Sequence, residues 1–267
     1  MGRRLAASGA SRRRAILRAL GFGTAALAFA GAVAWCYHRV DRFLATDERF
    51  VLAGPDGPHG PGVQIEGIRY APRSDILQVF AADFGKSVYL APLAERRRQL
   101  LAVDWVKDAA VERRWPRELR VRLVERQPVA FVRVPSRQAT QVVLIDAEGV
   151  FLRLPARARF ELPVLTGLLP QQSLPMRRVR VECALRVLKE VGPDLAARIS
   201  ELDVSDPDNV LITCTTQDQA LALKVGAENF RARLENFFAH YAEIRRRLPQ
   251  AAVFDLRLED RIIAEEP

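Results

Sequence analysis

The feature that most constrains this chain is an uncharged run near its N-terminus. From Ala19 to His38 the sequence has 20 residues without Lys, Arg, Asp or Glu. As a helix rising ~1.5 Å per residue, this run spans ~30 Å, the thickness of the hydrocarbon core of a membrane. Trp35 and Tyr37 lie near its far end, where aromatic rings favour the headgroup level. We therefore expect residues 19–38 to form a transmembrane helix.

The charges around this run predict its orientation. Six arginines lie within residues 1–18, and the first acidic residue is Asp41. The positive-inside rule then predicts a cytoplasmic basic tail at 1–18, a juxtamembrane spacer at 39–49 and a periplasmic body held at the inner membrane. Ala32-Val33-Ala34 resembles a signal-peptidase site, so two interpretations stay open, a retained single-pass anchor and a removed signal peptide.

The net charge of +9 does not indicate a nucleic-acid partner. The chain has 41 Lys and Arg, six of them in the tail, which leaves 35 basic residues against 32 acidic ones in the rest. A nucleic-acid binder concentrates positive charge on a folded face, and this body is nearly balanced.

The sequence contains none of the common catalytic or cofactor motifs. Gly-x-Ser-x-Gly, phosphate-loop and Cys-x-x-Cys patterns are absent, and His38, His59 and His240 lie far apart. We expect no enzymatic activity, no cofactor, no metal and no small-molecule substrate. Cys183 and Cys214 are either a disulfide or two buried thiols, and the sequence leaves both open.

The first part of the body, residues 50–126, alternates between strands and helices. We expect a brief strand at 50–52, a strand at 63–67, helices at 74–84 and from Pro92 onward, and strands at 105–111 and 119–123. The order strand-helix-helix-strand-strand predicts a small α+β layer.

Residues 127–267 predict a mainly β domain with packed helices. We expect strands near 129–134, 142–145, 150–152, 199–204, 210–215, 220–225, 253–256 and 261–263. Met176 to Val191 predicts a helix ended by Gly192-Pro193, and an apolar stripe from Phe230 to Leu248 predicts a second.

Several ordered motifs resemble the FtsQ/DivIB family of bacterial division proteins. The longest runs from Trp105-Val106 through Arg113, Pro116 and Glu125-Arg126-x-Pro128-x-Ala130. Shorter ones are Val63 to Gly67, Ile145-Asp146-x-x-Gly149, Leu162-Pro163-x-Leu165-x-Gly167 and Asp255-Leu256-Arg257. The resemblance implies a POTRA (polypeptide-transport-associated) domain at 50–126 and a β domain at 127–267. It implies a non-catalytic divisome scaffold at mid-cell that links early and late division proteins and binds FtsB and FtsL. A second hypothesis is that the POTRA layer, residues 63–126, docks another division protein or the translocon.

The last strand region is the candidate partner site. A terminal strand has a free edge to which a partner can add a strand, with Leu256, Leu258, Ile262 and Ile263 supplying side-chain pockets. The alternative is that this strand is simply core. Glu125, Arg126 and Pro128 are the candidate domain hinge, where Pro128 ends a strand and Glu125 with Arg126 tie the domains by a charge-assisted pair.

Two other classes compete with the scaffold. One is a POTRA component of a protein export or outer-membrane assembly system, which would need a transmembrane barrel with many alternating segments. The other is an exported enzyme with a cryptic site, which a pocket holding perturbed carboxylates would favour.

Overall fold

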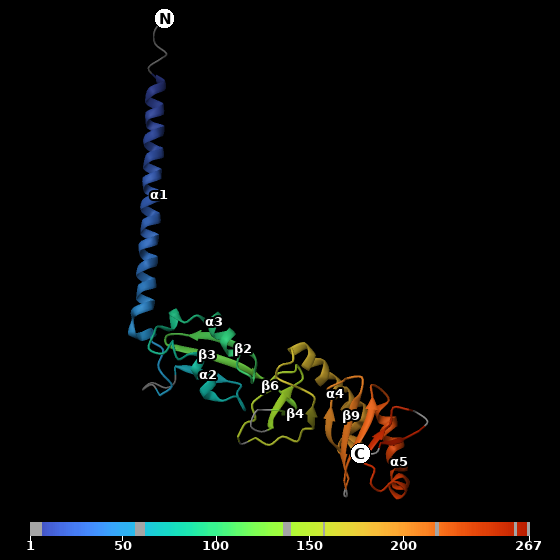
Figure 1. The fold of residues 1–267 in the computed structure, drawn as a ribbon. Coiled ribbons are helices and arrows are strands. Elements are labelled where there is room, and N and C mark those ends of the chain that lie inside the picture. The colour runs from blue at the N-terminus through green and yellow to red at the C-terminus, as the bar shows by residue number, and fades with distance from the viewer. Residues whose placement is uncertain are drawn as a thin grey trace. The chain divides into compact units, whose positions relative to one another are not determined.

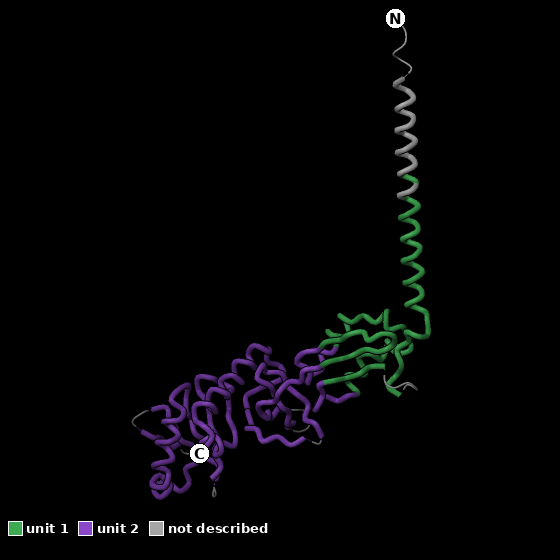
Figure 2. Tube along the Cα trace, turned by 180° about the vertical axis from the view of Figure 1, so that it is seen from behind, with its two compact units in different colours: residues 1–66, 74–99, 110–122 green, residues 67–73, 100–109, 123–267 purple. Residues whose placement is uncertain are grey.

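The computed structural model describes residues 7–56, 62–135, 140–156, 158–216, 219–258 and 261–265. The chain divides into two compact units (Figure 2). The first unit comprises residues 1–66, 74–99 and 110–122, and the second comprises 67–73, 100–109 and 123–267. Each unit is described by itself.

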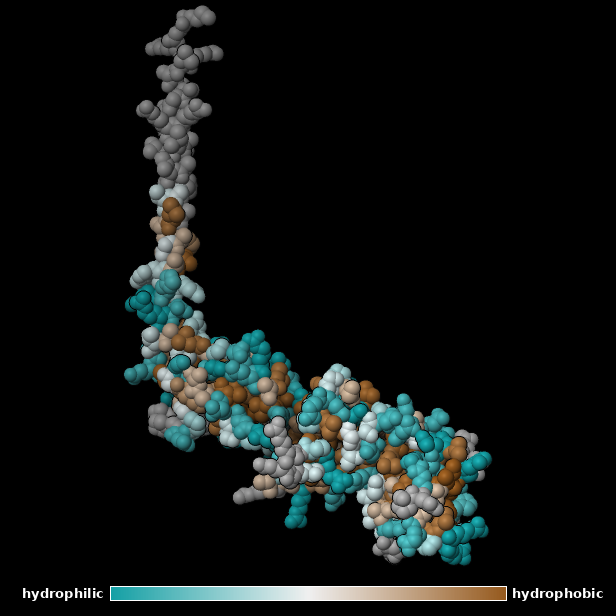
Figure 3. All heavy atoms as spheres, in the orientation of Figure 1, coloured by the Kyte–Doolittle hydropathy of each residue, from teal (hydrophilic) through white to brown (hydrophobic). Residues whose placement is uncertain are grey.

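A single long helix, α1 (Ala7–Thr46), opens the first unit (Figure 1). It contains the uncharged run, and large apolar side chains such as Leu27, Phe29 and Val33 lie exposed along it (Figure 3). Among the residues that the structure describes, no helix meets the combined length, charge and hydropathy expected of a membrane span.

The elements that follow α1 are β1 (Val63–Glu66), α2 (Arg73–Val79), α3 (Leu93–Leu100), β2 (Val106–Arg114) and β3 (Glu118–Glu125), with short 3-10 helices η1 (Glu48–Phe50) and η2 (Val88–Leu90). From β1 to β3 they have the expected strand-helix-helix-strand-strand order, and most of their residues belong to the first unit, whereas residues 106–109 of β2 and 123–125 of β3 belong to the second. The sheet order is β1-β3-β2, with β1 parallel to β3 and Val63 opposite Leu119. Ile76 of α2 and Phe80, which directly follows α2, are fully buried. The alternate β3 residues Leu119 and Val121 are buried as well.

Two predictions for this unit are wrong in detail. Residues 48–50 form η1, which Asp47 caps by accepting a hydrogen bond from the Arg49 N–H, and only Val51 makes an isolated bridge to Ser87. The helix expected at 74–84 is α2, which ends at Val79. Turn hydrogen bonds, such as that from the Phe80 N–H to the Leu77 carbonyl, replace the helical pattern after this residue.

The second unit is built on a nine-stranded sheet. Its strands are β4 (Pro128–Val134), β5 (Gln141–Asp146), β6 (Phe151–Leu152), β7 (Val164–Thr166), β8 (Ile199–Asp203), β9 (Val210–Thr215), β10 (Ala220–Gly226), β11 (Val253–Asp255) and β12 (Ile263–Glu265). Their order is β12-β11-β10-β9-β8-β7-β4-β5-β6. The last strand of the chain is therefore at one edge of the sheet.

Two helices, α4 (Leu174–Ala196) and α5 (Phe230–Arg247), accompany this sheet. Their apolar residues, including Val187, Leu234 and Phe237, share one core cluster with the inward-facing strand residues. The expected helix end at Gly192 is confirmed: φ there is 77° and ψ is 170°, after which the chain turns back into helix at Pro193.

The cysteines of this core are free thiols. Cys183 and Cys214 both belong to the core cluster, and no disulfide joins them. Burial raises the pKa of the Cys214 thiol to about 11. The sequence left two interpretations open, a disulfide and two buried thiols, and the structure supports the buried thiols.

Candidate interaction surface

The free edge of the large sheet is formed by β12. This strand pairs antiparallel with β11, with Phe254 opposite Ala264 and Asp255 opposite Ile263. The Lys224 ammonium donates to both Glu265 carboxylate oxygens at 2.6 Å, which connects β12 to β10 across the intervening strand. One side of β12 is paired, and its other side has no neighbouring strand among the described residues. Such an edge presents main-chain donors and acceptors to an added strand.

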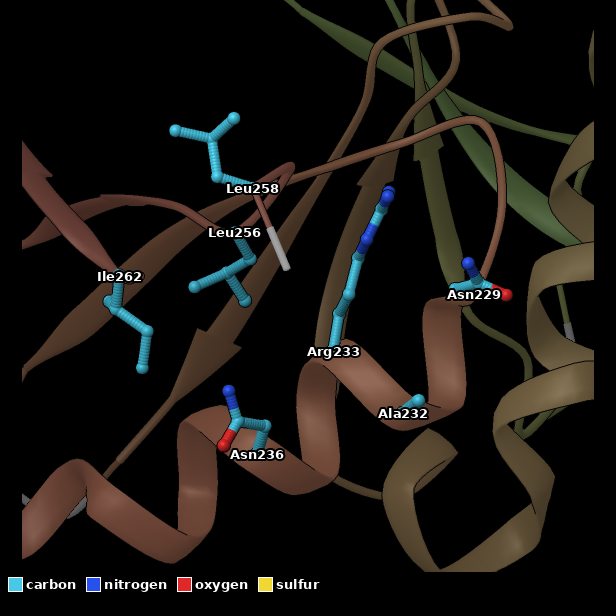
Figure 4. Close-up of a pocket in the computed structure, with 7 residues that line it drawn as sticks. All are labelled: Asn229, Ala232, Arg233, Asn236, Leu256, Leu258 and Ile262. Atoms are coloured by element: carbon cyan, nitrogen blue, oxygen red, sulfur yellow. The ribbon is translucent and has the colours of Figure 1, made fainter. Parts of the chain in front are cut away.

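A groove of about 330 Å³ lies beside this edge (Figure 4). One wall comes from the first turns of α5, and the other from the chain between β11 and β12. The lining residues are Asn229, Ala232, Arg233, Asn236, Leu256, Leu258 and Ile262. Arg233 donates from Nη1 to the Val225 carbonyl at 2.6 Å, so its guanidinium is held in place at the groove. The groove combines apolar side chains with two amides and one cation.

The four residues expected at the partner site have different positions. Ile263 begins β12 and is 42% exposed, and Leu258 is 49% exposed. Ile262 is half-buried and packs against the core. Leu256 is only 3% exposed, and its N–H donates to the Lys224 carbonyl. The structure therefore brings Leu256, Leu258 and Ile262 to one groove, and places Ile263 on the strand edge.

The two strands expected near 253–256 and 261–263 are both present, with shifted bounds. β11 ends at Asp255, and β12 begins at Ile263 and runs to Glu265. Leu256 belongs to the core rather than to an accessible strand. Between β11 and β12 the chain changes direction, since the two strands pair antiparallel.

That change of direction is fixed by Asp255 and Arg257. The Asp255 carboxylate accepts from the Arg257 backbone N–H at 3.0 Å and from its guanidinium at 2.6 Å. Arg257 also donates from Nη1 to the Asn209 side-chain oxygen at 3.0 Å. The Arg257 hydrogen bonds hold the pKa of Asp255 below its usual range. We call Asp255, Arg257 and Asn209 the corner cluster.

The expected hinge residues make different contacts from those predicted. The Glu125 carboxylate accepts the backbone N–H groups of Arg69, Tyr70 and Ala71 at 2.7–2.9 Å. Arg126 instead donates to Asp146 at 2.7 Å. These contacts all lie inside the second unit, so Glu125 and Arg126 anchor two separate segments and do not pair with each other.

Pro128 also differs from its expected role. It is the first residue of β4 and stands opposite Asp146, whereas we expected it to end the preceding strand. The first position of a strand tolerates proline because its missing N–H is not needed for the ladder.

Asp146 is the residue of this region whose role the sequence analysis did not assign. It is 1% exposed and also accepts from the Val150 N–H at 2.8 Å, so it connects Arg126 with the β5–β6 turn. Burial raises the pKa of Asp146, whereas the Lys107 ammonium lowers the pKa of the neighbouring Glu148. The Ile145-Asp146-x-x-Gly149 motif was its only signal in the sequence. No motif in the sequence pointed to Asn229 or Asn236, which line the groove on the side of α5.

The described residues contain no group of three or more His, Cys, Asp or Glu side chains placed to hold a metal ion. What this surface offers is main-chain hydrogen bonding at a strand edge and a mixed groove for a side chain. Both serve recognition of an extended peptide.

The β-α-α-β-β layer and the large sheet with a terminal edge strand define a POTRA-containing protein. Residues 62–126 match the FtsQ-type POTRA domain, and residues 135–257 match the C-terminal domain of cell division protein FtsQ/DivIB. The chain belongs to the FtsQ/DivIB family of cell division proteins.

Curated relatives agree with this assignment. The chain is similar to cell division protein FtsQ of Koribacter versatilis, with 32% identity over 80% of the chain and 61% of the relative. It is 30% identical to FtsQ of Novosphingobium aromaticivorans over 84% of the chain and 66% of the relative. FtsQ of Syntrophotalea carbinolica is 26% identical over 95% of the chain and 86% of the relative. The chain thus spans less than two thirds of the length of the first two relatives.

Proposed function

We propose that this protein is a non-enzymatic scaffold of the bacterial divisome, anchored in the inner membrane by one helix and acting in the periplasm at the division site. In this proposal the POTRA domain occupies residues 50–126 and the β domain residues 127–267. The scaffold links early and late division proteins and binds FtsB and FtsL. Its support is the family membership together with the free edge of β12.

The anchor is supported by residues 19–38 and their surroundings. The run lies inside one unbroken helix and exposes Leu27, Phe29 and Val33, which favours a lipid environment. The six arginines before it favour an N-terminus in the cytoplasm.

The partner site is supported by the geometry of β12. A segment of FtsB or FtsL that adds a strand to this edge would gain main-chain hydrogen bonds over Ile263–Glu265. Its side chains would enter the groove between α5 and Leu258, where apolar contact and the Arg233 cation provide specificity. Glu125, Arg126 and Pro128 are proposed to set the geometry of the domain junction through the contacts described above.

Substitution on the strand edge tests this proposal. We expect Ile263→Lys to weaken capture of FtsB by the full chain about tenfold or more, because an edge lysine opposes strand addition. Ile263 is exposed, so folding should be retained, as circular dichroism would verify. Val179→Lys is the matched control, since Val179 is 55% exposed but lies on α4. Capture that is equal for both variants would reject β12 as the partner site.

A further inference from the structure

A second surface, made of other residues than the proposed β12 partner site, lies at the C-terminal end of α1. The hairpin between β2 and β3 places Trp115 at its tip with 51% of its surface exposed. Trp115 makes an edge contact with Phe50 at 5.6 Å between ring centroids, and Phe50 makes another with Phe43 of α1 at 5.5 Å. These ring contacts connect the hairpin tip to the last turns of the helix. All of these residues lie within the first unit.

An open groove of about 600 Å³ borders this tip. Its lining is mainly aromatic and basic, with one acid: it includes Arg49, Phe50, Arg114, Trp115, Arg117 and Glu118. We call Arg114, Trp115, Pro116 and Arg117 the hairpin tip. A second hollow on α1 itself is lined by Arg39, Arg42 and Phe43, so basic and aromatic residues continue from the tip onto the helix.

The acidic and basic side chains at this surface differ in the hydrogen bonds and salt bridges that they make. Asp47 is bound by the Arg49 guanidinium at 2.9 and 3.0 Å, and Glu118 accepts from the Gln64 amide at 2.9 Å. Asp41 accepts from the Tyr89 hydroxyl at 3.0 Å. In contrast, Arg42, Arg114 and Arg117 form no salt bridge within the described part of the chain. Arg114 makes one long hydrogen bond, at 3.4 Å to the Gln64 side-chain oxygen, and Arg42 and Arg117 make no side-chain hydrogen bond among the described residues. These three arginines are therefore available to meet an anion, while Asp41 and Glu118 have neutral partners and Glu48 is exposed.

The position of this surface along α1 indicates which anion it meets. Phe43 lies five residues beyond His38, which is about 7.5 Å further along the helix. The headgroup layer extends roughly 5–8 Å beyond the hydrocarbon core on each side of a bilayer. A helix anchored through residues 19–38 thus places Phe43, and the rings in contact with it, at the depth of the headgroups. Tryptophan favours this depth, and arginine is attracted there by anionic lipids.

We propose that the hairpin tip, together with Arg42, binds the anionic phospholipid headgroups of the leaflet from which the chain emerges. The inference rests on the membrane anchor proposed above. The Trp115 indole lies among the headgroups, Arg114 and Arg117 meet lipid phosphates, and the ring contacts to α1 hold the tip at that depth. This contact fixes the first unit at the membrane surface by a second attachment beside the helix.

Tryptophan fluorescence of the full chain in vesicles tests the proposal. The Trp35→Phe variant leaves Trp105, which is buried, and Trp115 as the emitting residues. We expect lipids brominated near the headgroup to quench Trp115, and the quenching to rise about twofold or more when phosphatidylglycerol is added to phosphatidylcholine. Trp115→Phe in the same background should leave only the constant emission of Trp105.

Charge reversal separates the lipid contact from its alternatives. Arg114→Glu with Arg117→Glu should abolish the increase caused by phosphatidylglycerol, whereas Arg246→Glu with Arg247→Glu on α5 makes the same change in net charge and should preserve it. Equal quenching in both kinds of vesicle, unaffected by reversal at the tip, would overturn the proposal. An emission change caused equally by inorganic phosphate would assign the tip to a free anion and also overturn it.

Flotation of the same vesicles distinguishes this failure from failure of the anchor. A chain that floats with vesicles after alkaline extraction but shows no quenching of Trp115 refutes the lipid contact alone. A chain that does not float refutes the anchor, and the lipid contact with it.

Discussion

At the scale of single residues, Arg113 shows how one side chain stabilises a segment without regular secondary structure. Its Nε donates to the Val88 carbonyl at 2.9 Å, and its Nη2 donates to the carbonyls of Tyr89 and Ala91 at 3.0 and 2.6 Å. The Val88 carbonyl also accepts the Ala91 N–H at 3.3 Å, and a planar guanidinium with several N–H groups can reach all three carbonyls at once. Arg113 therefore fastens the segment before α3 to β2.

We expect Arg113→Met to destabilise the protein by about 2 kcal/mol, because the carbonyls of Tyr89 and Ala91 would lose the guanidinium as donor and that of Val88 would keep only the Ala91 N–H. Arg113→Lys should recover only part of this loss, since one ammonium cannot reproduce the guanidinium fork. Thermal unfolding measured by calorimetry checks the order wild type, lysine, methionine. Arg122→Met is the control, because Arg122 is half exposed and its ion pairs with Glu112 and Glu66 contribute little. Equal losses for Arg113→Met and Arg122→Met would contradict this role.

The same scale shows what sequence reasoning missed. The motif identified Glu125 and Arg126, but not their partners, because the backbone N–H groups at 69–71 and the Asp146 carboxylate come from distant parts of the chain. Leu256 looks like any other apolar residue of a strand, and only the tertiary fold shows that it is buried. Residue type predicts a tendency to form contacts, whereas the partner depends on topology.

At the scale of elements, most strands and helices could be predicted because their apolar periodicity is clear. The alternation of Leu119, Val121 and Leu123 with arginines gave β3, and the stripe from Phe230 gave α5. The errors fall where hydrogen bonding rather than burial fixes the backbone, at η1 and at the end of α2. The position of β12 at a sheet edge follows from strand order, which periodicity does not encode.

The corner cluster at the end of β11 carries a prediction about pH. The pKa of Asp255 is lowered in the fold, chiefly by hydrogen bonds from Arg257, with Lys224 of β10 adding to the effect. A lowered pKa means that this stabilisation is present above the unfolded value of about 3.9 and is lost as the pH falls through the folded value. We therefore expect β12 to loosen as the pH falls below about 4. Amide exchange protection of Ile263 and Ala264 measures this loosening.

Asp255→Asn should reproduce part of this loosening at neutral pH, because the amide no longer offers a charge to Arg257; we expect a loss of about 2 kcal/mol. Its further change on acidification should be smaller than that of the wild type. Glu95→Gln removes a carboxylate whose pKa is also lowered, by Arg98 in the first unit, and should leave protection of β12 unchanged. Protection of β12 that stays constant from pH 5 down to about pH 2 would contradict the prediction, because the folded pKa of Asp255 lies below the ordinary value near 3.9.

At the scale of the whole molecule, the proposed function depends on how the chain meets the membrane. In the proposed function, strand addition at β12 would recruit a partner wherever the protein is, whereas the proposed anchor would confine that recruitment to a membrane. The uncharged run has modest hydropathy because it is rich in Ala and Gly, and its apolar surface comes from a few residues such as Leu27, Phe29 and Val33. An anchor of this composition should be sensitive to a single added charge.

We expect Phe29→Arg, near the middle of the run, to oppose insertion by about 3 kcal/mol and to shift the protein out of the membrane fraction. Val40→Arg, just beyond the run and between Arg39 and Asp41, should leave membrane retention unchanged. Alkaline extraction of a chain tagged at both ends measures retention. A retained anchor predicts both tags on one full-length band in the pellet. Loss of the N-terminal tag with the C-terminal tag in the supernatant would instead show removal near Ala34, and the body would then act without its tether.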